Sequence, residues 1–345
     1  MQKTSLPEVS IIIVNWNGRD LLEDCFQSLS RQIYSDFEVI FIDNASSDNS
    51  VALAKKLAGN LNFPFNLVAL PSNTGFTGGN IEGLKHCQGR YIALLNNDTI
   101  VSDVWLESLV KAMEGHPKVG ICASKIIVAG TDMLDSAGEI LWSNLRTARR
   151  GLGLPSSSYT RMEYVFGAPG AAVLYRGQML DEIGFLDPDF FLYYEDSDLN
   201  FRAQLAGWKC LFVPDAVVQH KVNASAVNLW DIAEFKILKN DKITIIKNAP
   251  FLLLLKHLPL YLLEEIVFSV YYHIRAHRFN KYLRGISQFF KEFPRHLRKR
   301  RQVMEIKKVS TSYIESIMTP IGPQYRYKFQ NRFKSLMKSR ENPDA

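Results

Sequence analysis

Three short motifs in this sequence carry residue types that bind metal ions or move protons. NNDT (96–99) follows an apolar run, EDSD (195–198) follows an aromatic run, and Asp43 closes another apolar run. Mg²⁺ and Mn²⁺ prefer oxygen ligands, and one or two carboxylates plus substrate phosphates usually complete their coordination. Carboxylates also act as general bases. Asp98 is therefore a candidate metal ligand, and the acids of 195–198 are candidates for a general base.

Each motif also has an ordinary structural interpretation, which the sequence leaves open. Asn and Asp favour turns, so 96–99 also fits a loop. Acids suit the first turn of a helix, so 195–198 also fits a helix start with Glu195 beside Asp196. Asp43 suits either a hydrogen bond to a ribose or a nucleobase, or the cap of a following helix. The aromatic residues before Glu195 fit an acceptor platform or the core.

A glycine-rich loop and one histidine complete the set of candidates. NTGFTGGN (73–80) lacks the Lys and Ser/Thr of a P-loop and the spacing of a dinucleotide-binding turn, but its glycines permit close approach to a ligand. His220 ends the run VVQH, where a neutral imidazole suits a divalent metal or a structural hydrogen bond.

Apolar runs alternating with helical patterns predict the elements that position these residues. We predict strands at 9–14, 37–42, 66–70, 90–95 and 119–123, and helices at 20–31, 48–58 and 103–114. A further helix is expected to follow the glycine-rich loop 73–80 and to end at about Gln88. Ser46 or Ser47 is the expected cap of the second helix. This alternation indicates an α/β fold with a mostly parallel sheet flanked by helices. Because the carboxyl ends of parallel strands meet at one rim, Asn15, Asp43 and Asp98 are expected close together.

The middle of the chain gives a weaker pattern. Residues 125–164 are polar and irregular, and we interpret them as an excursion over the sheet that could include a hairpin. Regular structure is predicted again as a strand at 170–176, a short helix to Ile183, a helix at 196–206 and a strand from Cys210.

Charge divides the chain into two parts. Residues 1–230 hold 18 Lys and Arg against 25 Asp and Glu, whereas residues 231–345 hold 23 against 10. The basic part also contains an apolar stretch at 250–274, broken by charges and Pro259, so a clean transmembrane helix is not expected. Apolar segments beside basic ones are typical of a helical region that lies on a membrane surface. We therefore expect a body at 1–230 and a helical, membrane-associating region at 231–345.

The four cysteines lie far apart without a CxxC pair, and the apolar run near the N-terminus is too short for a signal peptide. These features favour a reducing compartment. Together with the basic region, they predict a cytoplasmic protein on the cytoplasmic face of the cell membrane.

Taken together, the motifs resemble the family-two inverting nucleotide-sugar glycosyltransferases, which have a GT-A fold. The matching stretches run in the family's order from about residue 9 to 221: VSIIIVNWNG, FEVIFIDNASSDNS, NTGFTGGN, YIALLNNDT, GAAVLYR and IGFLDPDFFLYYEDSDLNFRAQLAGWKCLFVPDAVVQHK. Within the family, NWNG, LLNNDT and FFLYYEDSDLNFR are most similar to bacterial rhamnosyltransferases of cell-surface polysaccharide assembly.

The resemblance implies roles for individual residues. Asp43 corresponds to the acid that reads the nucleobase, and Asp98 to the last acid of the Asp-x-Asp metal motif, with Asn96 at its first position. Asp196 corresponds to the catalytic base with Glu195 beside it, and His220 to a histidine that completes the metal site. The residues expected to contact the nucleotide sugar are Asn15, Asp43, Asn73, Gly75, Gly79, Asn96 and Asn97.

The implied reaction is metal-assisted transfer of a sugar from a nucleotide diphosphate to an acceptor hydroxyl. The divalent cation, Mg²⁺ or Mn²⁺, would neutralise the leaving diphosphate, and Asp196 would take the proton of the attacking hydroxyl. Subgroup likeness favours L-rhamnose from dTDP-rhamnose, with UDP-galactofuranose or UDP-N-acetylhexosamine as alternative donors. The basic region suggests a glycan or polyprenyl-linked acceptor.

Two other classes of function would explain part of this sequence. A sugar nucleotidyltransferase shares a nucleotide-binding α/β sheet, but it usually has a basic loop after its first strand, where this chain has NWNGRD. A basic nucleic-acid binder would explain the charge of residues 231–345, but no nucleic-acid motif accompanies it, so no nucleic-acid partner is expected.

Overall fold

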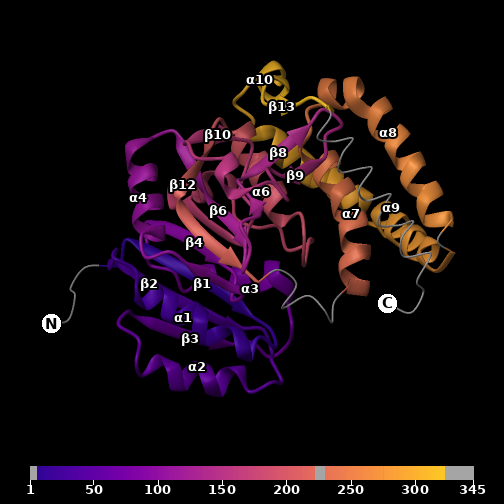
Figure 1. Ribbon diagram of the computed structural model, residues 1–345. Helices are drawn as coiled ribbons and strands as arrows, with labels where there is room; N and C mark the ends of the chain where they lie inside the picture. Colours follow the sequence, from indigo (N-terminus) through magenta and orange to yellow (C-terminus); the bar gives the residue numbers. More distant parts are fainter. Residues whose placement is uncertain (1–5, 222–229, 275, 323–345) are drawn as a thin grey trace.

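The computed structural model describes residues 6–221, 230–274 and 276–322. A large central sheet with helices on both faces forms one part of the molecule, and helices from the last third of the chain stand together at one side of it (Figure 1). The predicted α/β class with a helical C-terminal region is confirmed.

The central sheet has ten strands, eight of which lie in the order β10-β12-β6-β11-β4-β1-β2-β3. The strands of this sheet are β1 (Val9–Asn15), β2 (Phe37–Asp43), β3 (Phe65–Ala69), β4 (Tyr91–Leu95), β5 (Thr99–Val101), β6 (Val119–Val128), β7 (Leu134–Ser136), β10 (Glu163–Val165), β11 (Ala172–Arg176) and β12 (Lys209–His220). Strands β1 to β4 are mutually parallel, as are β6 and β12, whereas β11 runs antiparallel to both β4 and β6. The sheet is thus parallel where the sequence pattern was strongest and mixed beyond it.

The apolar runs form strands because both faces of the sheet are covered. Ile11 and Ile13 of β1 pack into the core on one face, and Ile12 packs into the core on the other. Such two-sided burial explains why the sequence shows continuous apolar runs rather than alternation. Three of these parallel strands, β1, β2 and β4, end at Asn15, at Asp43 and just before Asn96, so these polar residues meet at one rim.

The helices of the first 221 residues connect these strands. They are α1 (Leu22–Ser30), α2 (Ser50–Ala58), α3 (Gly75–Leu84), α4 (Trp105–Gly115), α5 (Gly177–Ile183) and α6 (Glu195–Leu205), with short 3₁₀ turns at Arg19–Leu21 and Ser156–Ser158. The prediction that Ser46 or Ser47 caps α2 was wrong. Asn49 occupies that position, and the backbone N–H of Ser50 donates to Asp48 Oδ1 instead.

The irregular middle segment contains more strands than its pattern suggested. Strand β7 pairs with β6, and β10 pairs with β12 at the sheet edge. A second sheet holds β8 (Glu139–Trp142) and β9 (Thr147–Arg149) as an antiparallel hairpin. This hairpin matches the option considered for 125–164.

The C-terminal region packs on this hairpin and on α6. It comprises α7 (Trp230–Asn248), α8 (Phe251–Ile274), α9 (Ala276–Glu305), α10 (Thr311–Ser316) and β13 (Met318–Thr319), and β13 adds a parallel strand to β8. Lys247 of α7 donates to Asp198 of α6 at 2.9 Å. Of the described helices, none is both long enough and apolar enough to cross a membrane.

Candidate functional site

A cavity of about 500 Å³ opens at the carboxyl rim of the parallel strands. Its walls come from the ends of β1 and β4, the glycine-rich loop, the β8–β9 hairpin, and the segment that leads into α6. Predicted site residues on this lining are Asn73, Gly75, Asn96, Asn97, Asp98, Glu195, Asp196 and His220. The fold thus brings together residues separated by more than a hundred positions in the chain.

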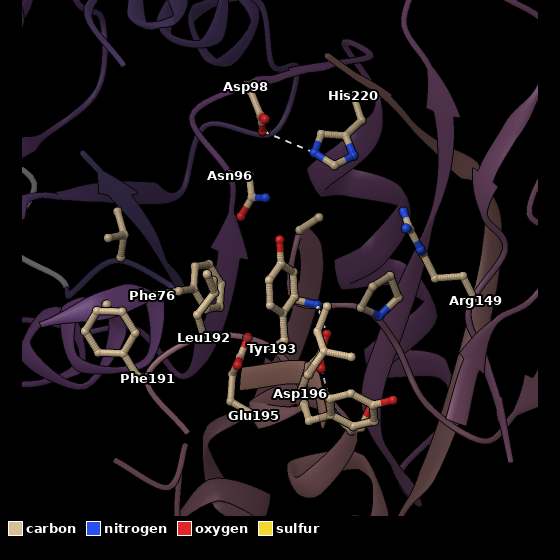
Figure 2. A pocket seen from close by; sticks show the side chains of 18 of the residues that line it. Phe76, Asn96, Asp98, Arg149, Phe191, Leu192, Tyr193, Glu195, Asp196 and His220 are labelled. Atoms are coloured by element: carbon tan, nitrogen blue, oxygen red, sulfur yellow. Dashed lines mark hydrogen bonds and ion pairs between the residues drawn. The ribbon is translucent and has the colours of Figure 1, made fainter. Parts of the chain in front are cut away.

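One end of the cavity carries the candidate metal ligands. His220 Nε2 lies 3.2 Å from Asp98 Oδ1 (Figure 2). His220 Nδ1 lies 3.0 Å from Asp135 Oδ2. All three side chains are largely buried. Burial alone would lower the pKa of His220, but hydrogen bonds to Asp135 and Asp98 outweigh it and raise the pKa to about 9. The imidazole is therefore protonated at neutral pH and bridges the two carboxylates.

The other end carries the candidate base, at the opposite side of the view in Figure 2. Asp196 Oδ2 accepts a hydrogen bond from the Gly170 N–H at 2.9 Å, and Asp196 Oδ1 accepts from the Ser197 N–H at 2.7 Å. Glu195 is also buried, but no side-chain or backbone group of the described residues donates to its Oε2. The two adjacent acids therefore differ in the support that their charged forms receive.

Burial and mutual repulsion raise the pKa values of the acids at this end. Burial raises the pKa of Asp196, and its backbone hydrogen bonds limit that rise. Burial and the nearby Asp196 charge raise the pKa of Glu195 well above its usual range. The same two causes act on Glu139, which accepts from Asn200 at 2.8 Å. Asp196 is therefore the carboxyl that ionises most readily of the three.

The glycine-rich loop forms the cavity wall beside residues 190–194, here called the aromatic segment. Gly75 has a φ of +75°, and a Cβ there would lie 2.3 Å from the carbonyl oxygen of Phe191. The Thr77 N–H donates to that same oxygen at 3.1 Å. The close backbone approach that glycine allows here is therefore toward Phe191.

Three predicted contact residues do not line the cavity. Asn15 links Asn97 to Asp43, accepting from Asn97 Nδ2 at 2.7 Å and donating to Asp43 Oδ1 at 3.1 Å. Asp43 is 2 % exposed, and its Oδ2 accepts from the Ser46 N–H. Gly79 faces Val14, whose Cγ1 would lie 2.7 Å from an added Cβ. Asn15 and Asp43 thus lie behind the lining, and Gly79 serves the packing of α3 on β1.

Three charged residues of the lining were not predicted from the sequence. Asp135 on β7 contacts His220, Arg149 on β9 forms an ion pair with Asp135, and Glu139 on β8 contacts Ser197. All three belong to the segment interpreted as irregular. The available signal was the pattern MLDSAGEILW, in which two acids four residues apart interrupt an otherwise small or apolar stretch.

Comparison with known protein families gives two matches along the chain. Residues 10–164 match the family described as glycosyl transferase family 2, and residues 91–319 match glycosyl transferase family group 2. The second match covers most of the region that the structure describes, including the C-terminal helices.

Curated relatives are bacterial enzymes of polysaccharide synthesis. The poly-beta-1,6-N-acetyl-D-glucosamine synthase of Staphylococcus aureus strain MSSA476 is 25% identical over 227 residues, which is 65% of this chain and 52% of the relative. The synthase of Staphylococcus epidermidis is 23% identical over 224 residues, or 64% of this chain and 52% of the relative. The chain thus spans about half the length of the curated relatives it matches.

Solved structures share the fold. A mannosyltransferase from Pyrobaculum calidifontis, in complex with GDP-Man and Mn²⁺, has a TM-score of 0.52 at 16% identity, covering 70% of this chain and 64% of that one. GalNAc-T7 with UDP, GalNAc and Mn²⁺ has a TM-score of 0.56 at 18% identity, covering 71% and 48%. At these identities, the likeness establishes the architecture of the chain.

Proposed function

Because the chain belongs to the family 2 group of glycosyl transferases, we propose that it moves a sugar from a nucleotide diphosphate donor to an acceptor hydroxyl. The transfer inverts the anomeric carbon in one displacement. The observation that carries this proposal is the single cavity with Asp98 and His220 at one end and Asp196 at the other. Family membership sets aside the sugar nucleotidyltransferase considered from the sequence.

Asp196 is the proposed base. A base must be ionised before it can accept the proton of the attacking hydroxyl, and backbone amides support the ionised form of Asp196. Burial and the Asp196 charge raise the pKa of Glu195 well above its usual range, so Glu195 is less suited than Asp196 to act as the ionised base. A well-placed general base contributes about 10²–10⁴ in rate.

The donor set at the other end fits a divalent cation. Asp98 supplies a hard oxygen ligand and His220 an imidazole nitrogen, and the oxygens of a diphosphate complete such sites in other proteins. The described residues contain no group of three or more His, Cys, Asp or Glu side chains arranged to ligate a metal by themselves. When bound, Mg²⁺ or Mn²⁺ would offset the charge of the leaving diphosphate. Asp135 would hold the imidazole of His220 through its Nδ1.

The nucleoside is proposed to lie beside the rim of β1 to β4. Asn73, Gly75, Asn96 and Asn97 are on the lining, whereas Asp43 and Asn15 support it from behind. Each carboxylate oxygen of Asp43 can accept a further hydrogen bond. Because Asp43 is buried behind the lining, its proposed contact with a nucleobase requires a small opening of this layer.

Two donor classes are proposed. UDP-N-acetylhexosamine is supported by the names of the curated relatives, which synthesise a polymer of N-acetyl-D-glucosamine. The motifs NWNG, LLNNDT and FFLYYEDSDLNFR support dTDP-L-rhamnose. A thermal-shift screen of nucleotide sugars with Mn²⁺ distinguishes them, since at equal concentration the ligand with the lower dissociation constant stabilises the folded protein more. Stabilisation by no nucleotide sugar would contradict the proposal.

We further propose that the transferase domain occupies 1–230 and that residues 231–345 place it on the cytoplasmic face of the cell membrane, near a lipid-linked glycan acceptor. The support lies in α8. Its two acids point inward, where Glu264 accepts from Asn144 at 2.6 Å and Glu265 pairs with Lys242 at 2.7 Å. Among the α8 side chains that the structure describes, the exposed large apolar ones, here called the α8 apolar face, are Phe251, Leu252, Leu255, Leu260, Leu262, Leu263, Ile266 and Val267.

This face suits a lipid surface. Helices that lie in a membrane interface bury apolar side chains at the boundary between headgroups and acyl chains. The basic excess of residues 231–345 complements the anionic headgroups of a cytoplasmic leaflet. In Figure 1, α8 lies on the outer side of α7, away from the central sheet.

A further inference from the structure

The segment that leads into α6 has an unusual backbone. Phe191, Tyr193 and Tyr194 have φ values of 65°, 66° and 73°, in the left-handed region that bulky side chains rarely adopt. Such conformations persist only where the surroundings hold them, and they concentrate at functional sites. All three residues line the cavity.

One side chain from the C-terminal region holds this segment. Nδ2 of Asn240, on α7, donates to the carbonyl oxygens of Phe190 at 3.1 Å, Leu192 at 3.0 Å and Tyr193 at 2.8 Å. Asn240 is 0 % exposed, so water does not compete for these carbonyls. Three acceptors gathered around one atom require a donor, and this fixes the orientation of the amide.

The segment is held from its other side by α3. The Thr77 N–H donates to the carbonyl of Phe191, the residue between two of the carbonyls that Asn240 holds. Gly75 leaves the room for this contact. The aromatic segment is therefore held between α3 and α7, in addition to its own hydrogen bond from the Leu192 N–H to the Phe190 carbonyl at 2.8 Å.

The position of the proposed base depends on this segment. Tyr194 is the residue immediately before α6, and its carbonyl accepts from the Asp198 N–H at 2.9 Å in the first turn. Glu195 and Asp196 follow directly. A change in the backbone of 190–194 therefore moves the start of α6 and the carboxyl of Asp196 with it.

We propose that Asn240 is a positioning residue for the transfer reaction. It acts through the aromatic segment on Asp196 and on the part of the cavity wall that this segment forms. This inference rests on the proposed function. It assigns to α7, outside the motifs that carry the family resemblance, a part in the geometry of the active site.

Other contacts keep α7 in place without Asn240. Lys247 binds Asp187 at 2.6 Å and Asp198 at 2.9 Å, and Lys242 binds Glu265 of α8 at 2.7 Å. Removal of the Asn240 amide should therefore release the aromatic segment while the helix stays docked. A misplacement of a reacting group by about 1 Å can reduce the rate about 100-fold.

The test compares Asn240→Ala and Asn240→Asp with the unaltered chain. The aspartate has the same shape but turns an oxygen toward the three carbonyls, so it removes every donor. Lys242→Met is the matched control, because it removes a buried polar contact of α7 that is directed at α8. The measurements are the dissociation constant of the nucleotide sugar with Mn²⁺, and kcat at saturating acceptor, expressed per donor-binding site.

We expect kcat per site to fall about 10- to 100-fold in both Asn240 variants while the donor dissociation constant stays within about twofold. Lys242→Met should keep kcat within about twofold of the unaltered chain. Equal kcat per site in Asn240→Ala would overturn the proposal, as would an equal loss in Lys242→Met. Loss of donor binding in both Asn240 variants would assign the residue a structural role alone and would also overturn it.

Failure of the proposed function gives a different pattern. In that case the unaltered chain transfers no sugar from any donor, and Asp196→Asn changes nothing. Failure of the inference about Asn240 leaves transfer by the unaltered chain intact and still dependent on Asp196.

Discussion

Glu195 and Asp196 are neighbours in the chain, but they receive different hydrogen bonds. Two backbone N–H groups point at Asp196, whereas Glu195 is buried beside the charge of Asp196. A sequence cannot distinguish two adjacent acids in this way, because the distinction comes from Gly170, which is 26 residues away. The resemblance to a known family selected Asp196, and the backbone hydrogen bonds supply a physical reason for that choice.

Replacing Glu195 by Gln should stabilise the protein at neutral and higher pH in the absence of donor. The folded state raises the pKa of Glu195, so above about pH 4.5 the unfolded chain releases this proton more readily and stability falls as pH rises. Gln removes that penalty. We expect a Tm a few degrees higher than that of the unaltered chain at pH 8, and no difference at pH 4, by calorimetry. A lower Tm at pH 8 would contradict the burial of an un-ionised Glu195.

Binding of Mn²⁺ should become tighter with increasing pH. His220 has a pKa of about 9, so the cation must displace a proton from Nε2 at neutral pH. Affinity is therefore expected to rise about tenfold per unit between pH 6 and 8, by isothermal titration with a nucleoside diphosphate present. In Asp135→Asn the histidine loses a partner that raises its pKa, so the dependence should weaken. A flat profile in the unaltered chain would argue against His220 as a ligand.

At the scale of elements, the sequence predicted the parallel strands and their helices closely, because their apolar runs are buried on both faces. The strand expected at 37–42 is Phe37–Asp43, and the helix expected at 103–114 is Trp105–Gly115. The strands within the segment 125–164 were not predicted from the sequence. Its strands are three or four residues long, too short to show a period, and they are held by partners far away in the chain, such as β12 and β13. The missed residues Asp135, Glu139 and Arg149 all lie there.

Helix α3 packs on β1 through glycines on one face. A Cβ at Gly83 would lie 2.5 Å from Cγ2 of Ile12, which is fully buried. Gly83→Ala should therefore reduce the free energy of unfolding by about 1–3 kcal/mol relative to Gly115→Ala. Gly115 is the matched control, because it also lies in a helix and has nothing within 4 Å of an added Cβ. Equal stability of the two variants in urea denaturation would contradict the packing of α3 described here.

At the scale of the whole molecule, the two halves of the charge distribution have different surroundings. Five acids of residues 1–230 line the cavity, namely Asp98, Asp135, Glu139, Glu195 and Asp196, while α8 holds its two acids inward and exposes large apolar side chains. In the sequence, Glu264 and Glu265 interrupt an apolar run. The sequence does not show that both acids turn inward. The partner of Glu264 is Asn144, which is distant in the chain, and the partner of Glu265 is Lys242, which lies on α7.

Loss of the α8 apolar face should release the protein from membranes. We expect the triple variant Leu262→Ser, Leu263→Ser and Ile266→Ser to bind anionic phospholipid vesicles at least about tenfold more weakly in a sedimentation assay. The reason is that three apolar side chains, exposed on the protein, no longer enter the membrane interface. The control variant changes three exposed apolar residues elsewhere, Ile33, Met162 and Tyr164, to Ser. Equal vesicle binding by the α8 variant and the unaltered chain would exclude this face.

The central claim is that this cavity performs sugar transfer with Asp196 as the base. It is tested most directly by the rate of nucleoside diphosphate release at saturating donor, acceptor and Mn²⁺, in the unaltered chain and in Asp196→Asn. The account predicts a fall of about 10²–10⁴ in Asp196→Asn with the donor still bound, and a smaller effect in Glu195→Gln. Transfer by Asp196→Asn at the rate of the unaltered chain would contradict it.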